Sequence, residues 1–248
     1  MGFSTLTKST VFSLKTYRLY WPNLISICVL MPITYLVVIF ATVPGDIEAL
    51  KAALVGYIVM TGFNTLFYIS ALYIANTFEE QVLESYVLLP VPFWEVILST
   101  ILAQVLVSIP PLVVGLVMLF LISSTINILL LVAGLAVILV IYNSLGILLG
   151  AKVRNMIKLN PLLVALMMIT IIATPVYYRL LYVSEPYRTL LLLNPLTHVV
   201  VVLRASVGVY EGFPVEFSLL YSALISALLL LLTWWRLRGG AFTVLEKK

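Results

Sequence analysis

The chain has 248 residues, of which 63% are hydrophobic and 10% are charged, and its net charge is +4. So little polar surface excludes a water-soluble globule and predicts an integral membrane protein. The positive charge would suggest nucleic acid in a soluble protein, but here the basic residues flank apolar runs and are interpreted as signals of membrane orientation.

Residues 1–22 are predicted to form a cytoplasmic helix that lies in the headgroup region of the membrane. Helical spacing separates four apolar residues from four polar or basic ones: Phe3, Leu6, Leu14 and Tyr17 against Ser4, Lys8, Lys15 and Arg18. The pattern ends in Tyr20 and Trp21, residue types that favour the membrane interface. Such an amphipathic helix lies along a bilayer rather than crossing it.

Residues 23–238 are predicted to form an all-α domain of six transmembrane helices, because six apolar runs have about the 20 residues that a spanning helix needs. The runs cover approximately 23–42, 52–75, 96–122, 128–150, 161–178 and 217–236. Prolines within or beside them predict kinked helices: Pro32, Pro110, Pro111 and Pro175. Cys28, the only cysteine, is expected to act as a small buried hydrophobe.

The distribution of Lys and Arg predicts the orientation. Six crossings place both termini on the same side, with residues 239–248 as a tail. Ten of the 14 basic residues lie in the N-terminal arm, the loop after the fourth span and the tail: Lys8, Lys15, Arg18, Lys152, Arg154, Lys158, Arg236, Arg238, Lys247 and Lys248. Since basic residues accumulate on the cytoplasmic side, both termini are expected in the cytoplasm and the chain in the cell membrane.

The segment 76–95, between the second and third spans, is where acidic residues interrupt the apolar sequence. It contains no Lys or Arg and four acids: Glu79, Glu80, Glu84 and Glu95. Helical spacing places Glu80 and Glu84 on one side of a short amphipathic helix, which Pro90 ends. Like charges four residues apart destabilise an isolated helix. A basic partner from outside the chain therefore explains this segment more simply than solvation alone.

The predicted spans contain almost no ionisable side chain between their ends, which argues against an ion-coupled carrier or a proton pump. The deepest polar residues are Asn64, Gln104, Asn143 and Ser144. Hydrogen bonding between helices is the favoured interpretation of these residues. Lining a transport pathway is the alternative.

The external segment 179–216 contains an apolar run, 194–209, which is too short to cross the membrane. It is predicted to dip into the outer leaflet or to lie in the interface. His198, the only histidine, has no Cys or acid within a few residues, so a structural role is favoured over metal binding or catalysis. The sequence also lacks a G-x-x-x-x-G-K-[ST] loop, and we expect no nucleotide or other cofactor to bind this chain.

Three motifs stand out in order along the chain. Residues 83–95 read LESYVLLPVPFWE after a Glu-rich stretch, residues 143–146 read NSLG, and residues 194–197 read NPLT with Arg204 ten residues after the Asn. Their order and spacing resemble the permeases of type-2 ABC exporters, the ABC-2 type family, over essentially the whole chain. The sequence departs from that family at three positions where many members have Gly, Thr and Arg, namely Gln81, Val82 and Phe93.

The resemblance implies a transport subunit that is not itself an enzyme. It implies that 76–95 is a cytoplasmic coupling helix and that an ATPase subunit, which holds ATP and Mg, docks on it through Glu79, Glu80, Glu84 and Pro90. Two permease copies, identical or different, would form the pathway between them. Asn194, Pro195 and Arg204 would act in external gating, or alternatively as a loop cap and a charge at the headgroups.

The substrate class and two other functions stay open. Spans without charges favour a lipid, an amphipathic drug or a hydrophobic peptide as cargo, and a polysaccharide is an alternative. One other function is a membrane scaffold that recruits a cytoplasmic protein through the acidic helix. The second is a membrane-embedded lipid-modifying enzyme, for which His198 would be the residue to test.

Overall fold

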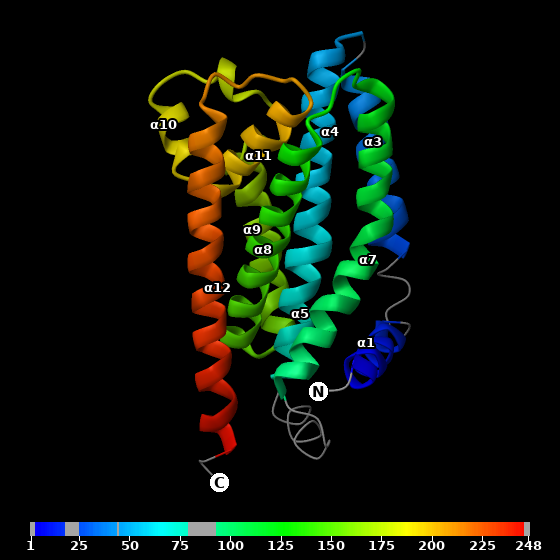
Figure 1. The fold of residues 1–248 in the computed structure, drawn as a ribbon, viewed down its shortest axis with the longest axis vertical. Coiled ribbons are helices and arrows are strands. Elements are labelled where there is room, and N and C mark those ends of the chain that lie inside the picture. The colour runs from blue at the N-terminus through cyan, green and yellow to red at the C-terminus, as the bar shows by residue number, and fades with distance from the viewer. Residues whose placement is uncertain (1–2, 18–24, 44, 79–92, 246–248) are drawn as a thin grey trace.

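The computed structural model describes residues 3–17, 25–43, 45–78 and 93–245. All regular secondary structure in these ranges is helical, and the long helices run side by side along the molecule (Figure 1). The first helix and the C-terminal end of the last lie at the same end of the bundle. We call this the terminal end and the opposite one the distal end.

Most of the elements are long α-helices, and two π-helices interrupt them. In chain order they are α1 (Phe3–Tyr17), a π-helix (Ser26–Leu30), α3 (Met31–Thr42), α4 (Ile47–Gly62), a π-helix (Phe63–Tyr68), α5 (Ile69–Thr77), α7 (Phe93–Ile122), α8 (Ile128–Val153), α9 (Met156–Ala173), a 3-10 helix (Leu180–Tyr182), α10 (Tyr187–Leu192), α11 (Pro195–Ser206) and α12 (Val215–Leu245).

Within the described ranges, five helices are long and apolar enough to cross a membrane: Ile47–Thr77, Glu95–Ile122, Ile128–Val153, Met156–Ala173 and Val215–Leu237. They correspond to the second to sixth predicted spans. The first predicted span, 23–42, begins outside the described residues, and the apolar helix found there, Cys28–Thr42, is shorter. A count of six transmembrane helices therefore stays a prediction.

The bounds predicted for the fifth span, 161–178, are wrong by about five residues at each end. Arg154 adopts a left-handed conformation with φ of 53° and ends α8. The side chain of Asn155 then accepts a hydrogen bond from the Lys158 amide at 3.0 Å, which caps a new helix at once. This helix ends at Ala173, because Thr174 precedes Pro175 and is therefore held in an extended conformation.

Two glycines let α8 pack closely on α5. A Cβ atom on Gly150 would lie 2.5 Å from the carbonyl oxygen of Ala71, and one on Gly146 would lie 2.9 Å from that of Phe67. The two positions are four residues apart on one face of α8. Such pairs of small residues allow helix backbones to touch in membrane proteins, and here they fix α5 against the centre of the bundle.

Helix α7 changes direction along its length (Figure 1), as its two prolines predict. Pro111 has no amide hydrogen, so the carbonyl of Val107, four residues earlier, loses its helical partner. The Cys28 thiol donates to this carbonyl at 3.7 Å. The cysteine is half-buried and therefore does more than fill space, because it satisfies a carbonyl that the proline exposes.

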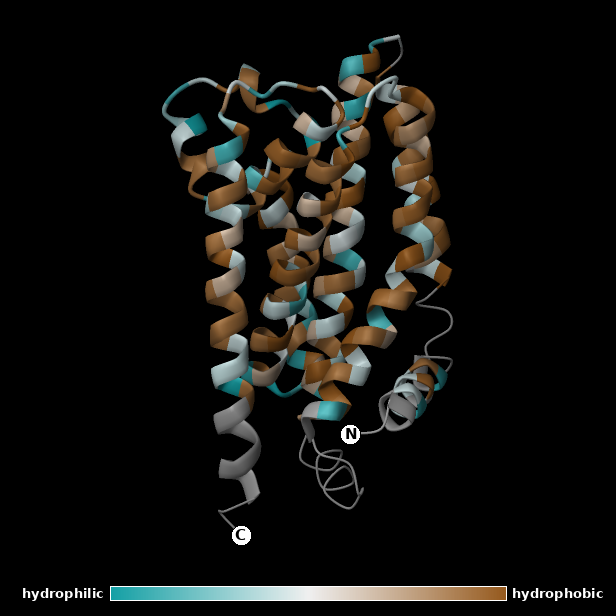
Figure 2. Cartoon of the chain, viewed as in Figure 1, coloured by the Kyte–Doolittle hydropathy of each residue, from teal (hydrophilic) through white to brown (hydrophobic). Residues whose placement is uncertain are grey.

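The long helices consist mostly of apolar residues along most of their length (Figure 2). Leu121 on α7, Ile172 on α9 and Leu231 on α12 are among many large apolar residues whose side chains are exposed. In water such a surface would cause association, whereas in a bilayer it faces lipid. The chain is therefore an integral membrane protein.

Candidate functional site

Polar side chains gather at two levels inside the bundle. At the distal end, Glu48, Arg179, Arg204 and Glu211 form a group that we call the polar clamp. Halfway along, Ser70, Gln104 and Asn143 form a second group that we call the mid-bundle cluster. The clamp joins segments far apart in sequence, and the cluster joins three long helices.

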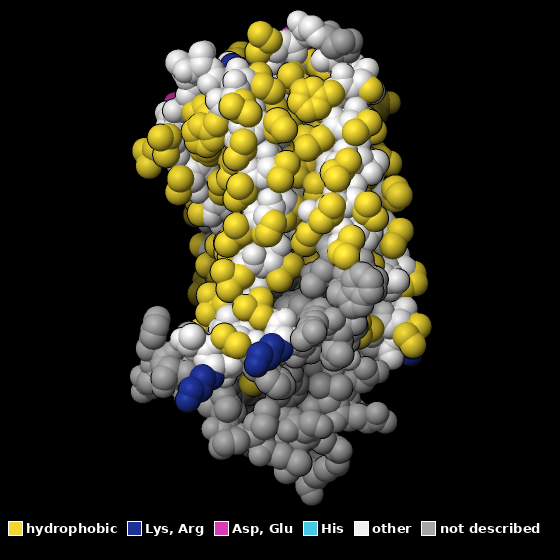
Figure 3. Space-filling view, turned by 90° about the vertical axis from the view of Figure 1, so that its right-hand side faces the viewer, with side chains coloured by type: hydrophobic (Ala, Val, Ile, Leu, Met, Phe, Trp, Pro, Cys, Tyr) yellow, Lys and Arg dark blue, Asp and Glu magenta, His cyan; other side chains and the backbone are white. Residues whose placement is uncertain are grey.

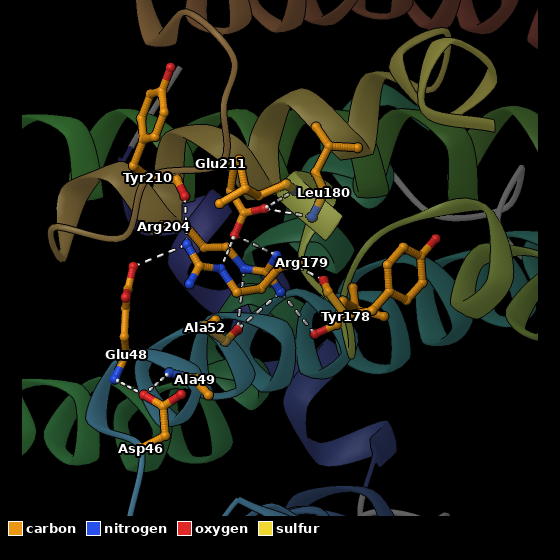
Figure 4. Close-up of polar contacts among 12 residues, drawn as sticks. Asp46, Glu48, Ala49, Ala52, Tyr178, Arg179, Leu180, Arg204, Tyr210 and Glu211 are labelled. Atoms are coloured by element: carbon orange, nitrogen blue, oxygen red, sulfur yellow. Dashed lines mark hydrogen bonds and ion pairs between the residues drawn. The ribbon is translucent and has the colours of Figure 1, made fainter. Parts of the chain in front are cut away.

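Arg204, near the end of α11, is the centre of the clamp (Figure 4). It is only 1% exposed. One terminal nitrogen donates to the Tyr178 carbonyl at 3.0 Å and lies 3.1 Å from a carboxylate oxygen of Glu211. The other donates to the carbonyls of Ala52 and Val176, each at 3.3 Å. One guanidinium thus ties α11 to α4 and to the segment that follows α9.

Glu211 completes the clamp from the loop after α11. Its second carboxylate oxygen accepts from the Leu180 amide at 2.6 Å, and its first lies 3.4 Å from Arg179 Nε. Arg179 also donates to the Tyr210 carbonyl at 2.6 Å and pairs with Glu48 of α4 at 3.0 Å. Each buried charge therefore has an opposite charge and backbone partners, as buried ions require.

Local sequence features place α4 within reach of these charges. Asp46 caps the helix by accepting from the amides of Glu48 and Ala49 at 2.9 and 3.1 Å, which sets Glu48 in the first turn. Two turns further along, Gly56 faces the Val176 carbonyl, and a Cβ there would lie 2.0 Å from its oxygen. Only glycine allows the segment around Val176 to approach so closely.

Burial and charge act in opposite directions on Arg204. Burial lowers its pKa, and the nearby carboxylate of Glu211 opposes this shift. Because the reference pKa of arginine lies above about 12, the guanidinium stays charged and needs its partners at every physiological pH.

The other two predicted gating residues lie at the opposite end of α11 from Arg204. Asn194 caps this helix by accepting from the Leu196 amide at 3.0 Å, and Pro195 is its first residue. The Asn194 side chain also donates to the Ala173 carbonyl at 2.8 Å. One end of α11 is thus fastened to the end of α9 and the other to the segment that follows it, although the predicted residues do not form one cluster.

The mid-bundle cluster is built around the second π-helix. Gln104 of α7 donates to the carbonyls of Thr65 and Leu66 at 2.5 and 3.2 Å, and both lie within that π-helix. The Ser70 hydroxyl, on α5, lies 2.5 Å from the Gln104 side-chain oxygen and 3.0 Å from that of Asn143 on α8. The sequence does not indicate a π-helix, and Ser70 was not among the predicted polar residues.

Asn64 differs from the other two candidates for pathway lining. Its side chain donates to the carbonyl of Met60 in its own helix at 3.0 Å, whereas Gln104 and Asn143 are joined across helices through Ser70. The structure thus brings two of the three predicted residues together. The side chains of Asn64, Gln104 and Asn143 are all buried within this one chain.

His198 lies on α11 in a group of aromatic side chains from the start of α12 and the preceding loop, namely Phe213, Phe217 and Tyr221. Its Nε2 donates to the Leu192 carbonyl at 2.8 Å, and its Nδ1 is 3.1 Å from the Ser218 hydroxyl. The histidine is buried. Within the described ranges, no three His, Cys, Asp or Glu side chains are grouped to hold a metal ion.

The predicted docking residues Glu79, Glu80, Glu84 and Pro90 lie outside the described residues. The helices that flank them are described. Helix α5 ends at Thr77 and α7 begins at Phe93, and both of these ends lie at the terminal end of the bundle (Figure 1). Glu95, in the first turn of α7, is buried.

The sequence did not indicate three of the four clamp residues. The sequence analysis singled out none of Glu48, Arg179 and Glu211. A usable signal existed, because Arg204 and Glu211 are opposite charges seven residues apart in a largely apolar stretch, and an isolated charge there would be costly.

A family model described as ABC-2 type transporter matches residues 3–207. This range includes the clamp residues up to Arg204 and the whole mid-bundle cluster. No curated protein matches the chain.

Proposed function

Because the chain belongs to the ABC-2 type transporter family, a family of transport permeases, we propose that it is the membrane-spanning subunit of an ATP-driven exporter. In this proposal a separate ATPase subunit binds ATP and Mg, and the permease carries no catalytic site of its own. Two copies of the permease, identical or different, form the pathway. The termini and segment 76–95 face the cytoplasm.

One observation supports this function most directly. The helix Ile47–Thr77 continues from the distal to the terminal end of the bundle. At its distal end, Glu48 is part of the polar clamp and the Ala52 carbonyl accepts a hydrogen bond from Arg204. Its other end leads into the proposed docking segment. A force applied by the ATPase at Glu79, Glu80 and Glu84 would therefore reach the clamp through a single helix.

The mid-bundle cluster supports a joint movement of two helices. Gln104 binds α7 to the π-helix that precedes α5, and α5 and α7 are the helices on either side of the docking segment. A push on that segment would then move both helices together instead of separating them. π-Helices often occur at functional sites within longer helices, which fits a bending point here.

The polar clamp would hold the distal end closed between transport cycles. Since a buried charge without its partner is costly, we expect this end to switch between a closed and an open arrangement rather than to vary continuously. ATP binding would shift the population toward the open arrangement through the contacts that the ATPase makes in that state. In this scheme Arg204 acts in gating, and Asn194 and Pro195 fix the helix that carries it.

The cargo that best fits the chain is a lipid, an amphipathic drug or a hydrophobic peptide. The charged residues of the five described spanning helices lie near their ends, so a polar or ionic cargo would find few partners at membrane depth. A pathway between two such subunits would present apolar surface to its cargo.

Co-purification tests the proposed function. The full chain is expressed with the ATPase encoded nearest to it, and ATP turnover of the complex is compared with that of the ATPase alone. A stable complex with altered turnover supports the exporter. If both proteins are folded and do not associate, the scaffold or lipid-enzyme alternatives replace it.

A further inference from the structure

A hollow of about 360 Å³ lies on α1, far from the polar clamp. Its described lining residues are Thr7, Lys8, Val11 and Lys15. At 3.6 residues per turn these four positions fall within about 100° around the helix axis. Lys8 and Lys15, two turns apart and both exposed, therefore face the same hollow.

The other side of α1 is fixed to the bundle. Ser13 is buried, and its hydroxyl lies 3.3 Å from that of Ser99 on α7. Around the helix, Ser13 is about 160° from Lys15. The basic hollow consequently opens away from α7 and toward the surroundings of the protein.

Helix α1 lies at the level where the apolar surface of the bundle begins. Among the described side chains of α7, Leu102 is the first large apolar one that is exposed, and it lies three residues, or about 5 Å, beyond Ser99. Figure 3 shows this face of the molecule, with basic side chains at the lower edge of the apolar surface. In Figure 1, α1 is seen nearly end-on beside α7, so it runs across the long axis of the bundle rather than along it.

The hollow carries the positive charges of Lys8 and Lys15. The chain contains no Asp or Glu before Asp46, so the N-terminal segment supplies no carboxylate of its own to neutralise Lys8 and Lys15. Val11 adds an apolar contact between the two lysines. A ligand that carries a negative charge next to apolar chains would satisfy both features.

We propose that this hollow binds the phosphate group of an acidic phospholipid in the leaflet at the terminal end of the bundle. The two ammonium groups hold the phosphate, and the acyl chains extend past Val11 into the bilayer, at the level where the exposed apolar surface begins. A free anion would meet the charges but not the apolar surface. The proposal concerns a resident lipid and does not depend on what the exporter transports or on its ATPase.

The test is a titration of the purified full chain in a neutral detergent with dioctanoyl phosphatidylglycerol, read by native mass spectrometry. Each lysine near an anionic membrane surface strengthens binding about fivefold, so K8Q/K15Q is expected to weaken binding about 25-fold. The matched control K152Q/K158Q removes two exposed lysines at the terminal end and should change the affinity less than twofold. K8R/K15R keeps both charges and should bind almost normally.

Three outcomes would overturn the proposal. Equal weakening in K8Q/K15Q and K152Q/K158Q would indicate diffuse attraction to any basic surface. Equal affinity for dioctanoyl phosphatidylcholine would show that negative charge is not recognised, and full competition by millimolar inorganic phosphate would identify a simple anion site. If K8Q/K15Q keeps its lipid affinity but no longer binds the ATPase, the hollow is a protein contact instead.

Discussion

Arg204 and Glu211 form an ion pair 3.1 Å long in which both side chains are almost completely buried. The two residues are seven positions apart in sequence, and the loop after α11 folds back so that the Glu211 carboxylate contacts the Arg204 guanidinium. Removing one partner of such a pair leaves an uncompensated buried charge, which is more costly than losing the pair as a whole.

The pair predicts a non-additive response to mutation. Arg204→Met should lower the free energy of unfolding by about 3–5 kcal/mol, because the buried Glu211 carboxylate then keeps only Arg179, at 3.4 Å, as an opposite charge. R204M/E211Q should lose less than R204M alone, because that carboxylate is removed as well. Unfolding in mixed detergent micelles measures the difference. Arg236→Gln, at an exposed position, is the control and should change stability little. Additive losses would show that the two side chains act independently.

Gln104 provides the second prediction. Gln104→Leu removes the donor to two π-helix carbonyls and leaves the Ser70 hydroxyl with Asn143 as its remaining partner. An unsatisfied buried polar group costs about 1–3 kcal/mol, although hydrogen bonds between membrane helices average less, so we expect a loss of about 1–2 kcal/mol. Faster hydrogen exchange of the backbone amides around Thr65 and Ile69 should accompany it.

Asn64→Ala is the comparison for Gln104→Leu. The hydrogen bond that the Asn64 side chain donates stays within its own helix, so its removal should affect stability less and leave exchange at Thr65 nearly unchanged. A selective loss of transport in Asn64→Ala with normal stability would instead indicate that this side chain lines the pathway. Unchanged exchange in Gln104→Leu would contradict a role of Gln104 in fixing the π-helix.

The spans could be predicted from sequence because hydropathy and helix caps are local properties. The five described spanning helices follow from their apolar runs, and an inspection of Asn155 could have corrected the start of the fifth predicted span. The π-helix could not be predicted, because Phe63–Tyr68 carries no local signal. It is stabilised by Gln104, about 40 residues away in sequence, which binds the carbonyls of Thr65 and Leu66.

The polar clamp also depends on contacts between residues that are distant in sequence. The sequence identified Arg204 through a motif, but its partners depend on how α4 and the segment after α9 meet it. The Ala52 carbonyl lies 152 residues away in sequence, and no pattern of residue types indicates which carbonyl an arginine will reach. The sequence therefore predicts that the Arg204 charge needs partners, but only the fold identifies those partners.

His198 predicts a dependence of stability on pH. Burial lowers the pKa of His198 below its usual value of 6.5, and the hydrogen bond to the Leu192 carbonyl opposes this shift. The unfolded chain then binds a proton more readily than the folded one, so stability is fully present above about pH 6.5 and falls as the pH drops toward the lowered pKa. Melting temperatures between pH 8 and pH 5 should show this decline, and His198→Gln should reduce it. An equal decline in both proteins would assign the effect to other groups.

The last prediction concerns the docking segment, whose acids are named from sequence alone. Glu80→Lys and Glu84→Lys together reverse two charges on one side of the predicted helix, so binding of the ATPase should be lost while membrane insertion is retained. Pull-down of the ATPase and extraction from membranes measure the two properties. The matched control E185K/E216K reverses two exposed acids near the distal end and should leave binding intact. Normal affinity in the Glu80 and Glu84 double variant would remove the docking role from this segment, whereas loss of binding in both double variants would indicate that net charge, rather than position, controls association.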